Sequence, residues 1–145
     1  MNKEEILNRL PYAKPFLFVD DLSEINENGI KGTFTYHKDL EFYKGHFKNH
    51  PITPGVILTE TMAHIGLVCF GIYLTGATNA MVMLSSCQID FIKPVDPGEK
   101  VTVTSIKNYF RFNKLSCKVV MENEAGEMVC KGEIAGMLID KSDGK

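Results

Sequence analysis

The stretch from Gly45 to His64, GHFKNHPITPGVILTETMAH, contains a histidine and a glutamate whose types and spacing fit acid–base chemistry. Glu60 lies in an apolar segment, where an unpaired carboxylate is rare because its desolvation costs several kcal/mol. His46 precedes that segment, between a glycine and a phenylalanine. An imidazole that titrates near neutral pH and a partly buried carboxyl group can divide proton removal and proton donation between them. Taken singly, each has an ordinary alternative: a solvated or hydrogen-bonded histidine, and a glutamate that reaches solvent or a lysine.

Pro54 and Gly55 mark a helix start whose free backbone N–H groups could stabilise a developing negative charge. The proline stiffens the entry to the apolar segment, and the glycine lets a ligand approach the free N–H groups of a first helical turn. Those N–H groups and the positive end of the helix dipole suit a carbonyl oxygen that gains negative charge. A base, an acid and such donors, all between residues 46 and 60, are what elimination next to a carbonyl group requires.

The N-terminal part of the chain is predicted to form a short helix and a β-hairpin. Asn2 is a suitable N-cap for a helix over residues 3–9. The apolar run at residues 16–19 favours a strand, and residues 30–37 alternate as the returning strand. Asn28-Gly29, between these two strands, is a pair suited to φ > 0 in a tight turn.

The middle of the chain is predicted to be a loop followed by one buried helix. Residues 38–54 combine glycine, prolines, aromatic residues and histidines, and a loop of this kind usually carries function or shapes its surroundings. From Gly55 to about Leu74 the residues favour a helix, and thirteen of these twenty positions are apolar. A helix that is apolar around its whole circumference must be buried on most sides. Gly76 is expected to end it.

After the helix the apolar period becomes two residues, which predicts four strands, at residues 80–92, 100–112, 115–122 and 128–139. Their short connections predict an antiparallel meander. A lone helix that is apolar on all sides needs a sheet curled around it. The sequence therefore predicts an α+β fold, with an antiparallel β-sheet wrapped around one long central α-helix, in a single domain over residues 1–145.

Size and composition narrow the functional classes. A length of 145 residues fits one domain, and a net charge of −2 argues against nucleic-acid binding. The first ten residues carry two glutamates and no apolar core of signal-peptide length, so no targeting segment is expected. A membrane span is disfavoured because Glu60 and His64 interrupt the apolar helix, and a charge at the bilayer centre costs about 2.5–3.5 kcal/mol. The four cysteines are scattered, so we expect reduced core thiols and a cytoplasmic protein.

The segment from Gly45 to His64 resembles the motif GHF-x-x-H-P-x-x-P-G of the FabZ family of 3-hydroxyacyl-[acyl-carrier-protein] dehydratases, which an E-x-M-A helix follows. The spacing of fourteen from His46 to Glu60 is the family's own. Two further segments resemble family motifs in the same order: LPYAKPFLFVD at residues 10–20 and FIKPVDPG at residues 91–98. The resemblance thus covers most of the chain.

The resemblance implies a hotdog fold and a role for each matching residue. His46 would remove the C2 proton of a 3-hydroxyacyl thioester, and Glu60 would bind and protonate the departing C3 hydroxyl. The amide of Gly55 would hold the thioester carbonyl, with Val56 and Phe47 as further substrate-binding residues. No metal or redox cofactor is expected, because the thioester itself stabilises the developing enolate.

The resemblance also implies partners. The substrate would arrive on the phosphopantetheine arm of an acyl carrier protein. The enzyme would be at least a homodimer, alone or as the unit of a trimer of dimers, with the histidine and the glutamate of each site coming from different subunits. Lys44, Lys48 and Lys93 have two interpretations, as solvated surface residues or as contacts for an acidic carrier protein or a phosphate.

The chain departs from the family pattern at three places. Tyr12-Ala13 replaces histidine-arginine, His64 replaces the usual glutamine, and Lys48 replaces proline. These changes leave the acyl chain and the pathway open, between fatty acid synthesis and a specialised polyene or secondary lipid. His64 is expected to be a hydrogen-bonding neighbour of Glu60. A metal site with His46 or His50 is the weaker alternative, because zinc takes three protein ligands.

Three other functions remain as alternatives. They are a hotdog acyl thioesterase, a dehydratase-isomerase, in which aspartate usually stands at the position of Glu60, and a non-catalytic acyl-binding subunit.

Overall fold

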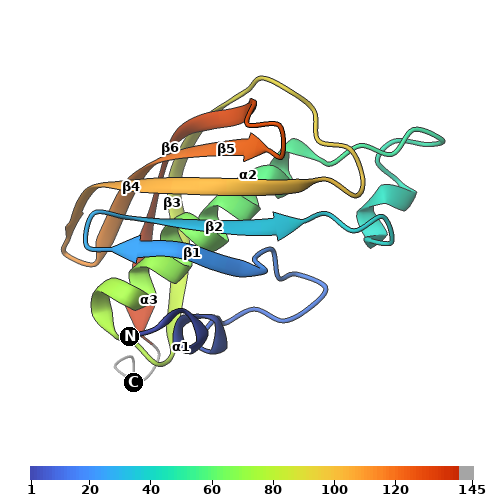
Figure 1. The fold of residues 1–145 in the computed structure, drawn as a ribbon. Helices are drawn as coiled ribbons and strands as arrows, with labels where there is room; N and C mark the ends of the chain where they lie inside the picture. Colours follow the sequence, from blue (N-terminus) through green and yellow to red (C-terminus); the bar gives the residue numbers. More distant parts are fainter. Residues whose placement is uncertain (141–145) are drawn as a thin grey trace.

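The structure is a computed structural model that describes residues 1–140, and a six-stranded antiparallel sheet curls around one long helix in it (Figure 1). The predicted α+β architecture is therefore confirmed. The strands follow the chain as β1 (Asp21–Asn26), β2 (Gly29–Thr35), β3 (Ala80–Phe91), β4 (Lys100–Arg111), β5 (Lys114–Asn123) and β6 (Met128–Asp140). Helix α1 (Lys3–Asn8) precedes them, and Asn2 forms the predicted N-cap as part of a capping box with Glu5.

The central helix runs from Gly55 to Thr75 and consists of α2 (Gly55–Ala63), a π-helical segment η2 (His64–Cys69) and α3 (Phe70–Thr75). Every residue from Thr61 to Ile72 is buried, as the apolar circumference predicts. The helix is long and apolar enough to cross a membrane, with a mean hydropathy of 1.6, but 72% of its apolar window is buried inside the sheet. It is thus the core helix of the fold. Gly76, at φ 69°, ends it.

The π-helical turn brings the helix backbone against the sheet. The carbonyl oxygen of Gly66 accepts hydrogen bonds from Ser105 Oγ at 3.2 Å and from Cys117 Sγ at 3.6 Å. A side chain at position 66 would meet Ser105 and Val119 at 3.0–3.2 Å, so a glycine permits the close approach. Such π turns are rare and frequently mark functional sites. This one begins at His64, four residues after Glu60.

The strand order in the sheet is β1-β2-β4-β5-β6-β3. Strands β4, β5 and β6 form the predicted meander, but the prediction that β3 pairs with β4 is wrong. Strand β3 pairs with β6 instead, from Ala80 opposite Asp140 to Phe91 opposite Cys130. The connection at residues 92–99 contains two prolines and lacks the two-residue turn of a tight hairpin. As a result, β3 forms one edge of the sheet.

Two predictions at the N-terminal hairpin are also wrong. Residues 16–19 form no strand: Phe18 and Val19 are apolar because they are buried in the core, and the strand begins at Asp21. The turn lies at residues 27–28, where the Asn26 side chain accepts from the N–H of Asn28. Neither Asn28 nor Gly29 has a positive φ. Position 29 needs glycine for another reason, since a Cβ there would run into the carbonyl oxygen of Ser105.

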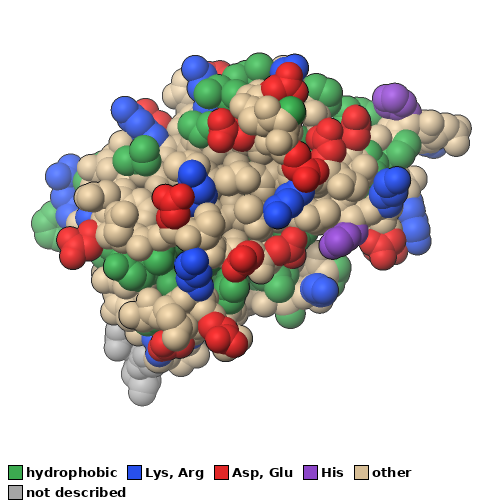
Figure 2. Space-filling model, in the orientation of Figure 1, with side chains coloured by type: hydrophobic (Ala, Val, Ile, Leu, Met, Phe, Trp, Pro, Cys, Tyr) green, Lys and Arg blue, Asp and Glu red, His purple; other side chains and the backbone are tan. Residues whose placement is uncertain are grey.

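The loop between β2 and the central helix contains one short regular element, the 3₁₀ turn η1 (Glu41–Lys44). The four cysteines are free, and three of them are buried as predicted (Cys69, Cys117 and Cys130), where burial raises the pKa of the Cys117 thiol to about 11. Cys87 is exposed on β3, contrary to the prediction. In Figure 2, acidic and basic side chains are interspersed over the visible face without a continuous basic band.

The contact of Gly29 with β4 leads to a stability prediction. We expect Gly29→Ala to lower the free energy of unfolding by about 1–3 kcal/mol, because the new methyl group forces β2 away from Ser105. Gly45→Ala is the matched control: nothing lies within 4 Å of a Cβ at that position. We expect it to change the free energy by less than about 0.5 kcal/mol. Urea denaturation followed by circular dichroism measures both, and equal effects would contradict the strand contact.

Candidate active site

His46 lies in the loop between η1 and the central helix, and backbone contacts fix its ring. Its backbone N–H donates to Phe42, and its backbone carbonyl accepts from the N–H of Ile52 at 2.9 Å. Its Nδ1 lies 3.0 Å from the carbonyl oxygen of Ile52. A carbonyl oxygen only accepts, so Nδ1 carries the proton of the neutral ring and Nε2 keeps a free lone pair. The ring stacks on Phe47, with 4.1 Å between centroids.

His46 lines a pocket of about 370 Å³ at the start of the central helix. Three of the predicted site residues, His46, Phe47 and Gly55, meet there. The remaining lining residues are mostly apolar: Ile52, Thr53, Leu58, Phe91, Ile92, Lys93 and Pro94. A base on a mainly apolar wall, next to a helix N-terminus, fits a ligand with an acyl chain and a polar carbonyl group.

Gly55 is the first residue of α2 and leaves backbone donors at this pocket. Pro54 is the N-cap and gives no side-chain hydrogen bond, while its carbonyl oxygen accepts from the N–H groups of Ile57 and Leu58. Within the described chain, the N–H groups of Gly55 and Val56 have no such partner. They are therefore available to a ligand, as helix N-termini generally are. A Cβ at position 55 would lie 3.3 Å from the ring of Phe91, so a side chain there would crowd the pocket wall.

Glu60 does not line this pocket, and neither does Val56. They lie one turn apart on α2, where Val56 is 76% exposed and the side chain of Glu60 is 32% exposed. Glu60 Oε2 is 3.0 Å from Nε2 of His64, whose side chain is completely buried. The predicted hydrogen bond between His64 and Glu60 is thus confirmed. Within one chain, the structure places the predicted base and the predicted acid at separate positions.

His64 has a second contact, which the sequence did not reveal. Its Nδ1 accepts a hydrogen bond from the backbone N–H of Phe18 at 3.2 Å. Three aromatic rings surround the imidazole, and Tyr12 stacks on it with 3.8 Å between centroids and 12° between planes. Burial, and to a lesser degree the nearby Glu60, raise the pKa of Tyr12 to about 12, so its phenol is neutral. The only hint of the contact between Tyr12 and His64 in the sequence was that both residues depart from the family pattern.

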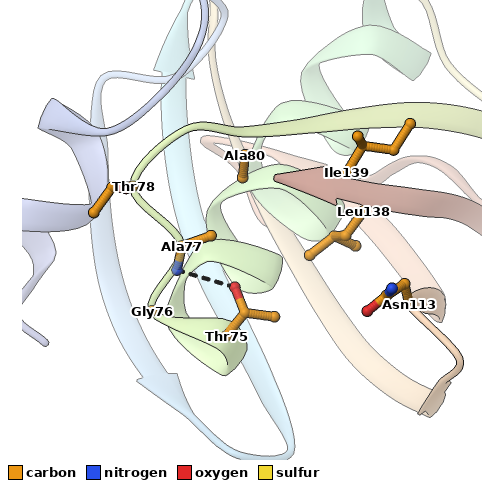
Figure 3. A pocket seen from close by; sticks show the side chains of 8 residues that line it. All are labelled: Thr75, Gly76, Ala77, Thr78, Ala80, Asn113, Leu138 and Ile139. Atoms are coloured by element: carbon orange, nitrogen blue, oxygen red, sulfur yellow. Dashed lines mark hydrogen bonds between the residues drawn. The ribbon is translucent and has the colours of Figure 1, made fainter. Parts of the chain in front are cut away.

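Other parts of the described chain offer less chemistry. No three histidine, cysteine, aspartate or glutamate side chains in residues 1–140 lie close enough together to hold a metal ion. A pocket of about 270 Å³ lies at the far end of the central helix (Figure 3), where Thr75 Oγ1 accepts from the N–H of Ala77. Its eight described lining residues include no acid, base or thiol. The pocket next to His46 is therefore the candidate active site.

Solved structures with the same architecture define the fold. The dehydratase heterocomplex ApeI:P from Xenorhabdus doucetiae matches with a TM-score of 0.74 at 12% sequence identity, over 95% of this chain and 93% of that chain. The PaaI protein from the phenylacetic acid degradation operon of E. coli matches with a TM-score of 0.67 at 16% identity, over 92% of each chain. A sheet wrapped around one helix, shared with these proteins, is the hotdog fold.

Sequence comparisons then define the family. A family model described as ApeI-like, ApeI dehydratase, matches residues 22–133. The 3-hydroxyacyl-[acyl-carrier-protein] dehydratase FabZ of Sinorhizobium medicae is 33% identical over 144 residues, which is 97% of this chain and 91% of that protein. FabZ of Petrotoga mobilis is 40% identical over 104 residues, 70% of this chain and 72% of that protein. The chain belongs to the family of FabZ-type and ApeI-like dehydratases, as its motifs predicted.

The burial of the four histidines leads to a prediction of their reactivity. Diethyl pyrocarbonate acylates an unprotonated, accessible imidazole nitrogen. We expect the exposed His37 and His50 to react first, the half-buried His46 to react at its free Nε2, and the fully buried His64 to react last. Peptide mass spectrometry over a time course gives the four rates. A rate for His64 equal to that of His50 would contradict the enclosure described above.

Proposed function

We propose that this protein is a lyase that dehydrates 3-hydroxyacyl thioesters carried on acyl carrier protein to trans-2-enoyl thioesters. The observation that carries the proposal is that His46, with a free Nε2, and the unpaired N–H of Gly55 share one pocket, in a chain that belongs to a dehydratase family. The same pocket has the apolar wall that an acyl chain requires.

In the proposed mechanism, the N–H of Gly55 donates to the thioester carbonyl oxygen. Nε2 of His46 removes a proton from C2, and the negative charge moves onto the carbonyl oxygen, where the helix N-terminus stabilises it. The electron pair then forms the C2–C3 double bond as the C3–O bond breaks. Glu60 donates a proton to the leaving hydroxyl, which departs as water. The proton on His46 later passes through solvent to the Glu60 carboxylate and restores the starting state.

We further propose that Glu60 acts in the site of a partner subunit. Glu60 and Val56 do not line the pocket that contains His46 in the same chain, and Val56 is exposed. Among the strands that the structure describes, β3 pairs on one side only and is therefore an edge of the sheet. It carries exposed apolar side chains, including Met83, Leu84 and Phe91. A two-fold axis at this edge would cover the apolar surface and would bring the partner subunit's Glu60 to the pocket.

The proposed arrangement is a homodimer, alone or as the unit of a trimer of dimers, in the cytoplasm. The neighbour from Xenorhabdus doucetiae is a heterocomplex. A different hotdog chain is therefore the alternative partner. Activity of the purified chain as a homo-oligomer supports the first arrangement. Activity only after addition of a different hotdog chain supports the heterocomplex.

The carrier protein is proposed to dock beside Lys93, which lines the pocket. Lys93 forms an ion pair with Glu127 at 3.1 Å, and Lys44 forms one with Glu41 at 3.1 Å. Lys48 is exposed in the loop that precedes the central helix. Both ion pairs are on the surface and therefore weak. An acidic carrier protein would displace the glutamates at little cost, and the phosphate of the pantetheine arm suits the same ammonium groups.

A hotdog thioesterase is the second candidate, favoured only by the shared fold. The thioesterase HI1161 of Haemophilus influenzae has a TM-score of 0.57 at 16% identity. The two activities give different products from a 3-hydroxyacyl thioester. Elimination produces enoyl absorbance and leaves the thioester intact, whereas hydrolysis releases a free thiol.

The proposed roles of His46 and Glu60 predict the effect of two substitutions. We expect His46→Ala and Glu60→Gln each to lower the rate of dehydration by about 10²–10⁴-fold, because each removes a whole base or acid. The rate is followed by the absorbance of the enoyl thioester formed from 3-hydroxyacyl-carrier protein. Unchanged thermal unfolding is the control for folding. Wild-type turnover in either variant would disprove the mechanism.

The shared site predicts that two inactive variants restore activity together. We expect a hybrid dimer of one His46→Ala subunit and one Glu60→Gln subunit, isolated through two different affinity tags, to have one complete site. Its activity should be about half that of the wild-type dimer, since the second site lacks both groups. If His46 and Glu60 of the same chain form the site, the hybrid will be as inactive as its parents.

A further inference from the structure

We propose that His64 is a positioning residue for Glu60, held as the neutral Nε2–H tautomer by the backbone N–H of Phe18. The inference rests on the proposed catalytic role of Glu60 and adds a second residue to that site. It starts from two hydrogen bonds, one at each nitrogen of a completely buried imidazole.

The contact with Phe18 determines the tautomer. A backbone N–H only donates, so Nδ1 of His64 must be the acceptor, without a proton. The single proton of the neutral ring is then on Nε2, 3.0 Å from Oε2 of Glu60. A second proton, on Nδ1, would point at the N–H of Phe18 across 3.2 Å. His64 is therefore a neutral donor to Glu60, and the pair is a hydrogen bond rather than an ion pair.

The surroundings of His64 fix the orientation of the ring. Tyr12 stacks on one face, and Phe16 and Phe18 contact the imidazole at centroid distances of 5.6 and 5.4 Å. None of these three side chains carries a charge: two are phenylalanines, and the raised pKa of Tyr12 keeps its phenol protonated. The ring thus has one rotamer in which both nitrogens are satisfied, and rotation would break both hydrogen bonds at once.

The consequence for catalysis is that the two oxygens of Glu60 have different roles. Oε2 is occupied by the N–H of His64, so Oε1 is the oxygen that can carry the proton to the leaving hydroxyl. A fixed carboxyl group loses less entropy on reaching the transition state than a mobile one. A charged imidazolium would hold Glu60 as a carboxylate and weaken it as an acid. A neutral donor also favours the carboxylate, but less than a full positive charge does, so it positions the group at a smaller cost to its acidity.

Two substitutions separate the two hydrogen bonds. The amide nitrogen of glutamine is as many bonds from Cα as Nε2 of histidine, so His64→Gln keeps a donor for Glu60 and loses the acceptor for Phe18. The amide of asparagine is as many bonds from Cα as Nδ1, so His64→Asn keeps an acceptor for Phe18 and loses the donor for Glu60. Both variants remove the imidazole ring, and each therefore controls for the loss of packing in the other.

We expect His64→Asn to lower kcat by an amount on the order of 10²-fold with little change in KM, because Glu60 is no longer aligned with the leaving group. His64→Gln should retain kcat within roughly tenfold of wild type, as a 1.4 kcal/mol change in alignment free energy would allow. If His64 is merely a packing residue, the two variants will have equal kcat values or kcat will follow their thermal stabilities, and the inference is overturned. If Glu60→Gln is itself fully active, the proposed function fails instead, which distinguishes the two failures.

The tautomer has its own measurement, independent of activity. In protein labelled with ¹⁵N-histidine, we expect the signals that disappear in both His64 variants to show a protonated Nε2 and an unprotonated Nδ1 at neutral pH. A proton on Nδ1, or on both nitrogens, would overturn the assignment even if both variants fold.

Discussion

The structure depends on burying a long helix that carries a single carboxylate among apolar side chains. The sheet encloses the helix from Thr61 to Ile72, so Glu60 lies where the enclosure begins and keeps only part of its contact with solvent. An unpaired carboxylate at that position would oppose folding. Nε2–H of His64 donates a hydrogen bond to Glu60. The backbone N–H of Phe18 occupies Nδ1 of the same ring, which keeps the proton on Nε2. The hydrogen bond that stabilises Glu60 at this position would also align it for its proposed role as the acid.

The same helix explains why Glu60 does not line the pocket of His46 within one chain. In its first turns, Gly55 lines the pocket of His46, whereas Val56 is exposed and neither Val56 nor Glu60 lines that pocket. Successive residues on a helix point about 100° apart, so residues of the same turn can reach two different surroundings. One direction provides amide donors to the pocket in the same chain. In the proposed dimer, the other direction would offer the carboxyl group of Glu60 to the pocket of the partner subunit.

Local patterns in the sequence were sufficient for the central helix and the four long strands after it, but not for the pairing of the strands. The bounds of the central helix and of β4 to β6 follow from apolar periodicity, because each element buries a face determined by its own residues. The position of β3 beside β6 depends on contacts far apart in the chain, which periodicity does not encode. The run at residues 16–19 shows the same limit: its burial was evident, but burial in a core without sheet pairing has the same pattern as a strand. The bond between Phe18 and His64 joins residues 46 positions apart, so only the fold reveals it.

Two histidines of this chain have opposite hydrogen bonds at Nδ1 because each meets a different backbone group. Nδ1 of His46 faces a carbonyl oxygen and must donate, which leaves the lone pair of Nε2 free. Nδ1 of His64 faces an N–H and must accept, which makes Nε2 a donor. The residue type alone predicts neither role, since a neutral imidazole has both a donor and an acceptor nitrogen. The main chain at Ile52 and Phe18 assigns the two hydrogen-bonding states, which the proposed mechanism uses for a base in the pocket and for a donor to the acid.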